Sequence, residues 1–217
     1  MKPSLVEPGN TAVLTMEMQR GVVGDLSMMD SLVAEVVAAR TIERAARLVA
    51  AARGVGVRVV HCTAEFRPDL AGTAVNSPLI AFWARRPGHM RAGTPSTELV
   101  PEIGVDEVDL VASRRHGVSP FTGTSLDATL RSLGVTTVIA TGVSVNLAIL
   151  GLCIEAVNLG YQVVVATDAV AGVPRAYADA VMEHTLALLA TRATVDEIAG
   201  AWSSAGAAKP PANEVRA

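Results

Sequence analysis

Short apolar runs alternate along the chain with longer segments in which apolar residues recur at helical spacing. The runs at 11–16 (TAVLTM) and 136–141 (TTVIAT) are almost wholly apolar or β-branched, which is typical of buried strands. The pattern predicts six strands, at 11–16, 57–61, 108–112, 136–141, 162–167 and 193–195. It predicts helices between them, at 30–53, 79–84, 124–134, 146–158 and 174–190.

Alternating strands and helices of this kind indicate an α/β fold. Strands that are apolar on both faces belong to a parallel sheet that helices cover on both sides. The chain of 217 residues, 50% of them apolar, suits one domain with a substantial core. We expect residues 1–202 to form that single domain. We expect residues 203–217, which include Lys209-Pro210-Pro211, to be a disordered tail.

Composition excludes several functional classes. The net charge of −3 disfavours a nucleic-acid partner, which would favour a basic surface. No run of 18 apolar residues predicts a membrane span, and the N-terminus lacks the apolar core of a secretory signal. We therefore expect a cytoplasmic protein without a membrane partner. Phosphate-loop and dinucleotide motifs are absent from the sequence, so we expect no cofactor.

Polar side chains follow several of the predicted strands. Ligands of open parallel sheets bind beyond the carboxyl ends of the strands, so these residues are candidates for a site. They are Glu17, Gln19, His61, Cys62, Glu65, Arg114, Arg115, His116, Ser144, Asn146 and Asp168.

Four segments together resemble the isochorismatase-like hydrolase superfamily, which also includes nicotinamidases and N-carbamoylsarcosine amidohydrolases. They are 16–24 (MEMQRGVVG), 115–135 (RHGVSPFTGTSLDATLRSLGV), 136–149 (TTVIATGVSVNLAI) and 156–172 (AVNLGYQVVVATDAVAG). The resemblance covers roughly residues 11–201. It implies a three-layer α/β/α sandwich around a six-stranded, mostly parallel sheet, and a homo-oligomer that acts on a small-molecule substrate.

Cysteine-using members of this superfamily carry an Asp–Lys–Cys triad, and the resemblance places other residues there. Glu17 stands at the Asp position, Arg115 at the Lys position and Ala148 at the Cys position. Isochorismatases proper also lack the cysteine and hydrolyse a vinyl ether without a covalent intermediate. The resemblance therefore implies a hydrolase in which Glu17 is the general acid/base. Arg115 would hold an anionic substrate, and Arg114 would face solvent.

The turn after the predicted strand at 136–141 carries further candidates. The resemblance implies a cis peptide bond between Val143 and Ser144, and a polar cradle formed by the backbone N–H groups of Ser144 and Ala148. Asn146 is a candidate for substrate contact or, more simply, a helix cap.

Other polar candidates also have a simpler structural interpretation. Gln19 can bind substrate or support the scaffold through hydrogen bonds. His116 can act as an acid or base, although a lone histidine is more often structural. Asp168 is expected to fix the turn that follows it. Arg85 and Arg86 are either solvated charges or part of a lid from a partner subunit.

The histidines and cysteines do not suggest a metal site. His61 and His89 are 28 positions apart without clustered partners, and zinc requires clustered His or Cys ligands. Two cysteines, Cys62 and Cys153, are too few for a disulfide scaffold.

Two alternatives to the acid/base hydrolase remain open. One is a catalytically inactive protein that binds a metabolite or a protein through the same pocket. The other is an amidohydrolase in which Cys62 or a water molecule attacks the substrate.

Overall fold

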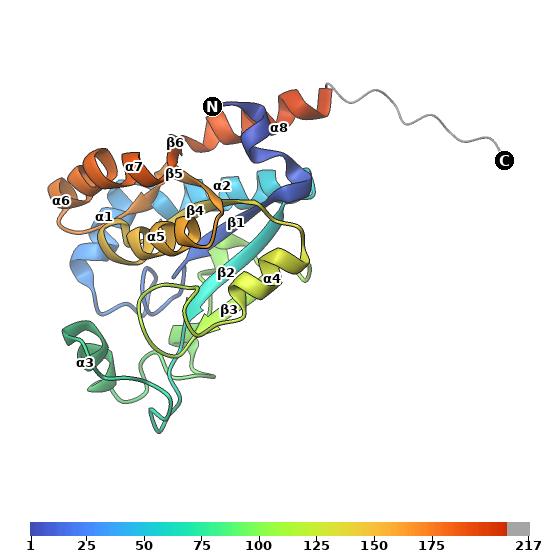
Figure 1. Ribbon diagram of the computed structural model, residues 1–217. Coiled ribbons are helices and arrows are strands. Elements are labelled where there is room, and N and C mark those ends of the chain that lie inside the picture. The colour runs from blue at the N-terminus through green and yellow to red at the C-terminus, as the bar shows by residue number, and fades with distance from the viewer. Residues whose placement is uncertain (208–217) are drawn as a thin grey trace.

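The computed structural model describes residues 1–207 and has one six-stranded sheet with helices on both faces (Figure 1). The strand order is β3-β2-β1-β4-β5-β6, and every pair of neighbours is parallel. The strands are β1 (Thr11–Met16), β2 (Arg58–Ala64), β3 (Leu110–Arg114), β4 (Thr137–Val143), β5 (Gln162–Ala171) and β6 (Thr191–Ala193). The predicted three-layer α/β/α fold is therefore confirmed.

The helices divide between the two faces of the sheet. They are α1 (Asp30–Ala38), α2 (Thr41–Gly54), α3 (Pro78–Ala84), α4 (Leu126–Ser132), α5 (Leu150–Asn158), α6 (Arg175–Ala180), α7 (Ala187–Leu189) and α8 (Val195–Ala207). Helices α1, α2 and α8 contribute to the apolar core on one face, and α4, α5 and α6 to the core on the other. No helix within residues 1–207 combines the length and apolarity needed to span a membrane.

Alternation of side chains along the strands builds both cores. All six residues of β1 are buried. Val13 belongs to one core, and Ala12, Leu14 and Met16 belong to the other, because successive side chains of a strand point to opposite faces. The two ends of the domain are also joined: Trp202 of α8 donates a hydrogen bond from Nε1 to the backbone oxygen of Val6 at 2.7 Å.

Three predicted helices differ from the structure. The segment 30–53 forms two helices, because Arg40 takes a left-handed conformation with φ of 52° between α1 and α2. The segment 146–158 starts with a π-helical turn, Val145–Ile149, before α5. The segment 174–190 likewise contains a π-helical stretch, Val181–Leu186, between α6 and α7.

The predicted tail also differs. Residues 203–207 continue α8 instead of being disordered, and the remainder of the predicted tail, 208–217, lies outside the described residues.

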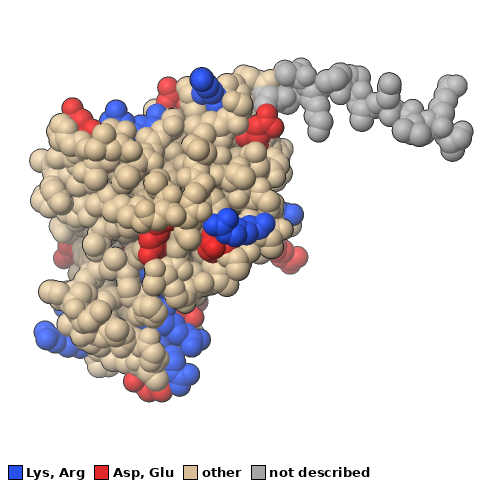
Figure 2. All heavy atoms as spheres, viewed as in Figure 1, with Lys and Arg blue, Asp and Glu red and all other residues tan. Residues whose placement is uncertain are grey.

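The carboxyl ends of β1 to β4 meet at one edge of the sheet. The long segment between β2 and β3 contains α3, and the part of it around α3 lies beyond this edge as a lobe (Figure 1). Its later part, with Val100 and Ile103, belongs to the core that α2 covers. Basic side chains gather on this lobe, while most of the rest of the visible face is uncharged (Figure 2). Gly142 lets β4 pass the end of β1 closely. Its φ is 106°, and a Cβ there would lie 2.2 Å from the backbone oxygen of Met16.

Candidate active site

An ion pair joins the ends of β1 and β3 at the carboxyl edge of the sheet. Glu17 directly follows β1 in a left-handed conformation with φ of 52°, and its N–H donates to the backbone oxygen of Cys62 at 2.9 Å. Its carboxylate Oε1 accepts a hydrogen bond from Nη2 of Arg114, the last residue of β3. The two side chains are only 17% and 6% exposed, so the pair is largely shielded from water.

The guanidinium of Arg114 has one further donor that the protein does not use. Its Nε donates to the backbone oxygen of Gly117 at 3.3 Å, and Nη2 bonds Glu17. Nη1 is buried and has no hydrogen-bond partner among residues 1–207. Burial lowers the pKa of Arg114 to about 10, which still leaves the group cationic at neutral pH. Arg114 therefore places a cation in this wall with donor capacity that no protein group within residues 1–207 satisfies.

Arg114, and not Arg115, is the arginine of this site. Arg115 is exposed and is not among the residues that line the cavity described below. The reason is the position of the strand, which ends at Arg114 instead of at residue 112 as predicted. Ala112 and Arg114 are buried on one face of β3, because side chains two positions apart point the same way.

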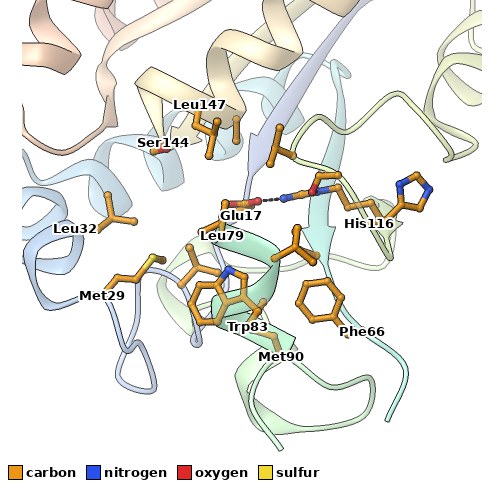
Figure 3. Close-up of a pocket in the computed structure, with 17 residues that line it drawn as sticks. Glu17, Met29, Leu32, Phe66, Leu79, Trp83, Met90, His116, Ser144 and Leu147 are labelled. Carbon is orange, nitrogen blue, oxygen red and sulfur yellow. Dashed lines mark hydrogen bonds and ion pairs between the residues drawn. The ribbon is translucent and has the colours of Figure 1, made fainter. Parts of the chain in front are cut away.

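Glu17 and Arg114 form part of the wall of a cavity with a volume of about 80 Å³. The labelled side chains in Figure 3 surround the pair, with Trp83, Met90 and Phe66 together on one side of it. Most of the lining is apolar: Val22, Met29, Leu32, Ala64, Phe66, Leu79, Ile80, Trp83, Met90, Val118, Leu147 and Ala148. Charges act more strongly on a ligand in such a low-dielectric environment than in water.

Three other predicted residues also line the cavity: His116, Ser144 and Ala148. The peptide bond between Val143 and Ser144 is cis, as the resemblance implied. The backbone oxygen of Ser144 accepts hydrogen bonds from the N–H groups of Leu147 and Ile149 at 3.1 and 3.0 Å, which begins the helical segment that carries Ala148.

Gln19 does not line the cavity, and its side chain is occupied in the scaffold. Nε2 donates to the backbone oxygens of Ala64 and Thr97, both at 2.9 Å. Oε1 accepts from the N–H of Ala64 at 2.8 Å. Gln19 is fully buried, so the structure corrects its expected place among the substrate-binding residues. It instead links the end of β2 to the lobe.

Asn146 also lies outside the cavity. Its Nδ2 donates to the backbone oxygen of Val173 at 3.3 Å, in the loop after β5. The helical segment that follows Ser144 has no side-chain cap, so the expected capping role is wrong. Asn146 lines a neighbouring open groove instead.

Neither cysteine lies in the cavity wall. Cys62 in β2 and Cys153 in α5 are 1% and 0% exposed and belong to the core on one face of the sheet. Burial raises the pKa of each thiol to about 12. The attacking form of cysteine is the thiolate, which such thiols do not form at neutral pH. The alternative in which Cys62 attacks the substrate is therefore unsupported.

The histidines expected to lack a metal role have protein partners. His61 bonds Thr15 Oγ1 at 2.7 Å through Nδ1 and Asp109 at 3.2 Å through Nε2. His89 stacks on Trp83 with ring centroids 5.0 Å apart and bonds the backbone oxygen of Gly21 at 3.2 Å. Within residues 1–207 no three His, Cys, Asp or Glu side chains are grouped as metal ligands.

The remaining candidates have structural contacts. Asp168 lies within β5, which continues to Ala171, so the turn expected after it is not formed. Asp168 accepts a hydrogen bond from the N–H of Val195 at 2.8 Å, which ties β5 to the start of α8. The guanidinium of Arg86 lies 3.4 Å from the ring centroid of Phe82 and donates to the backbone oxygen of the same residue at 2.7 Å. Arg86 therefore stabilises the end of α3, while Arg85 is exposed.

The apolar wall of the cavity was not predicted from the sequence. Leu79, Ile80 and Trp83 of α3 contribute to it, and so do Met29 and Leu32 from the start of α1. The one available signal was the apolar run 79–83 (LIAFW) in a segment otherwise rich in Pro and Gly.

Comparison with known proteins finds similarity over most of the chain. Residues 11–197 match the family model described as the isochorismatase domain. YwoC of Bacillus subtilis, an uncharacterized isochorismatase family protein, is 40% identical over 72 residues, which is 33% of this chain and 38% of that protein. Maleamate amidohydrolase of Pseudomonas putida is 29% identical over 132 residues, 59% of each chain. The matched regions thus span less than two thirds of these curated relatives.

A solved structure is similar over nearly its whole length. N-carbamoylsarcosine amidase from Thermoplasma acidophilum is 25% identical with a TM-score of 0.69, and the match covers 87% of this chain and 98% of that one. Because the family model extends over most of the chain, from β1 into α8, this protein belongs to the isochorismatase family.

Proposed function

We propose that this protein is a hydrolase that cleaves a small carboxamide or ureido compound by direct attack of water, with Glu17 as the general acid/base. The observation that carries the proposal is the Glu17–Arg114 pair in the wall of an apolar cavity to which neither cysteine contributes. The similarity to maleamate amidohydrolase and to N-carbamoylsarcosine amidase supports a C–N bond as the target.

Glu17 begins the reaction as a base. The carboxylate of Glu17, which is paired with Arg114, accepts a proton from water while the water oxygen bonds to the carbonyl carbon. Negative charge develops on the carbonyl oxygen, and the free Nη1 of Arg114 donates to it. Glu17 then returns the proton to the leaving nitrogen, the C–N bond breaks, and the carboxylate is regenerated.

The other polar residues of the cavity support this sequence of steps. In the proposal, the backbone N–H groups of Ser144 and Ala148 are further donors to the carbonyl oxygen, and His116 is a further polar contact for the substrate. The paired Glu17 is less suited to vinyl ether hydrolysis, which requires the carboxyl to be protonated first. We therefore place carboxamides and ureido compounds before vinyl ethers.

The test is turnover of a panel of small carboxamides, N-carbamoyl compounds and vinyl ethers including isochorismate, followed by mass spectrometry. Wild type is compared with Glu17→Gln and with the matched control Glu107→Gln, which changes an exposed carboxylate. We expect Glu17→Gln to reduce kcat/KM by roughly 100-fold or more and Glu107→Gln to match wild type.

Two results would contradict the proposal. Full activity in Glu17→Gln removes the assigned general base. Thermal stabilisation of wild type by a panel member that it never converts identifies a binding protein instead of a hydrolase.

A further inference from the structure

An open groove adjoins the cavity and shares part of its wall. Ten residues line it: Met28, Met29, Asp30, Ser31, Leu32, Phe82, Ser144, Asn146, Leu147 and Val173. Four of them, Met29, Leu32, Ser144 and Leu147, also line the cavity. The groove volume of about 570 Å³ is much larger than the 80 Å³ of the cavity. The two spaces therefore adjoin at these four residues, and the groove is the larger of the two.

The junction between the two spaces lies at one end of the site. In Figure 3, Met29 and Leu32 lie on one side of Glu17, and His116 lies on the other. A molecule whose carbonyl group meets Glu17 and Arg114 can therefore extend past Met29 and Leu32 into the groove. The cavity itself is small, so a substrate of more than a few carbon atoms would have to extend into the groove.

The side chains of the groove indicate what it binds. Met28 and Leu147 are 50% and 40% exposed, and Phe82 and Val173 add further apolar surface. Asp30 is the one charged residue among the ten that line it. Apolar side chains favour an aliphatic or aromatic extension, while the carboxylate of Asp30 disfavours an anionic end group.

We propose that this groove is a second substrate subsite, which holds an uncharged apolar chain attached to the group that is hydrolysed. The inference rests on the proposed hydrolase function and narrows its substrate to carboxamides or ureido compounds with an apolar tail. The shared wall favours a substrate over a protein partner, because a protein seated on these four residues would also close the entrance to the cavity.

The experiment uses primary carboxamides of increasing chain length, from propanamide to octanamide, with ammonia release as the readout. Each methylene that leaves water for the groove contributes about two- to fourfold in kcat/KM, so wild type prefers octanamide strongly over propanamide. We expect an amide of similar length with a terminal carboxylate to react more slowly than the neutral amide, because of Asp30.

Two variants test the groove. Met28→Asp places a charge in it and is expected to reduce the octanamide-to-propanamide ratio of kcat/KM by at least fivefold. Leu188→Asp is the matched control, since Leu188 lies on α7, is 84% exposed and does not line the groove. This control is expected to retain the wild-type ratio.

The outcomes separate this inference from the proposed function. Turnover with no dependence on chain length, or a ratio unchanged by Met28→Asp, overturns the subsite and leaves the hydrolase intact. If no amide is hydrolysed, the proposed function fails, and calorimetry with octanamide then tests the groove alone. Octanamide binding that Met28→Asp weakens supports the subsite. Absence of octanamide binding overturns the subsite. A dimer that Met28→Asp converts to monomers in sedimentation identifies the groove as an interface between copies and overturns the subsite.

Discussion

Arg114 donates a hydrogen bond from Nη2 to Oε1 of Glu17, although the two residues are 97 positions apart in the sequence. The contact spans the ends of β1 and β3, which lie on either side of β2 in the sheet. It places a cation and a carboxylate together in an apolar wall, and Nη1 of the guanidinium has no hydrogen-bond partner among residues 1–207.

The two adjacent arginines are expected to differ sharply in importance. Arg114→Met removes the guanidinium that we propose as a donor to the substrate, and it should lower kcat/KM by about 100-fold. Arg115→Met changes an exposed side chain outside the cavity and should retain wild-type activity. Steady-state kinetics of both variants, with circular dichroism to verify folding, make the comparison. Equal losses in the two variants would contradict the assignment of Arg114.

The cysteines are expected to be dispensable for activity. Both thiols have a pKa raised to about 12 by burial, so iodoacetamide at pH 7 should leave turnover unchanged. The double variant Cys62→Ala, Cys153→Ala should retain kcat/KM while losing on the order of 1 kcal/mol of stability per site, because each change empties space in the core. Inactivation by alkylation, in step with labelling of one thiol in the native protein, would contradict this.

Stability is expected to fall as the pH drops below about 6.5, the ordinary value for histidine. Burial lowers the pKa of His61, although Asp109 opposes this effect. The unfolded chain therefore binds this proton at a higher pH than the folded chain does. The contribution of His61 to stability is fully present above the pKa that this residue has in the unfolded chain. It is lost as the pH falls from there toward the lower pKa of the folded chain. Burial also lowers the pKa of His89, which acts in the same direction.

Urea unfolding at pH 7.5 and 5.5 measures this effect. Burial would raise the pKa of Asp109, but hydrogen bonds, chiefly from Arg53, lower it overall, so this carboxyl titrates below the chosen window. His61→Gln should reduce the difference between the two pH values, whereas His184→Gln, at an exposed position, should preserve it. An unchanged difference in His61→Gln would assign the effect to other groups.

Gln19 is expected to matter for stability through its three backbone contacts. Gln19→Leu keeps the size of the side chain but leaves buried groups of Ala64 and Thr97 without their partner. Such groups cost about 1 to 3 kcal/mol each when left unpaired, so we expect a loss of roughly 3 kcal/mol in the free energy of unfolding. Gln162→Leu, at an exposed position in β5, is the control and should lie within about 0.5 kcal/mol of wild type. Similar stabilities for the two variants would contradict the scaffold role.

The fold class could be predicted from the sequence alone, and so could the positions of several residues of the candidate site. Apolar and β-branched runs predicted all six strands, because a strand buried on both faces has no polar alternation to obscure it. A parallel sheet brings the carboxyl ends of its strands to one edge, so Glu17 and Ser144 could be assigned to that edge from the strand ends alone. Ala148 was located by its resemblance to the family motif.

Which side chains meet at that edge depends on contacts between residues that are far apart in the sequence. Arg114 and Arg115 are indistinguishable in a sequence unless the end of β3 is known to the residue, because a shift of one residue exchanges the two faces of a strand. The role of Gln19 depends on Ala64 and Thr97, which are 45 and 78 positions away. The apolar wall from α3 depends on where the lobe packs. Local periodicity carries no information about such distant contacts, since they form only when the chain folds.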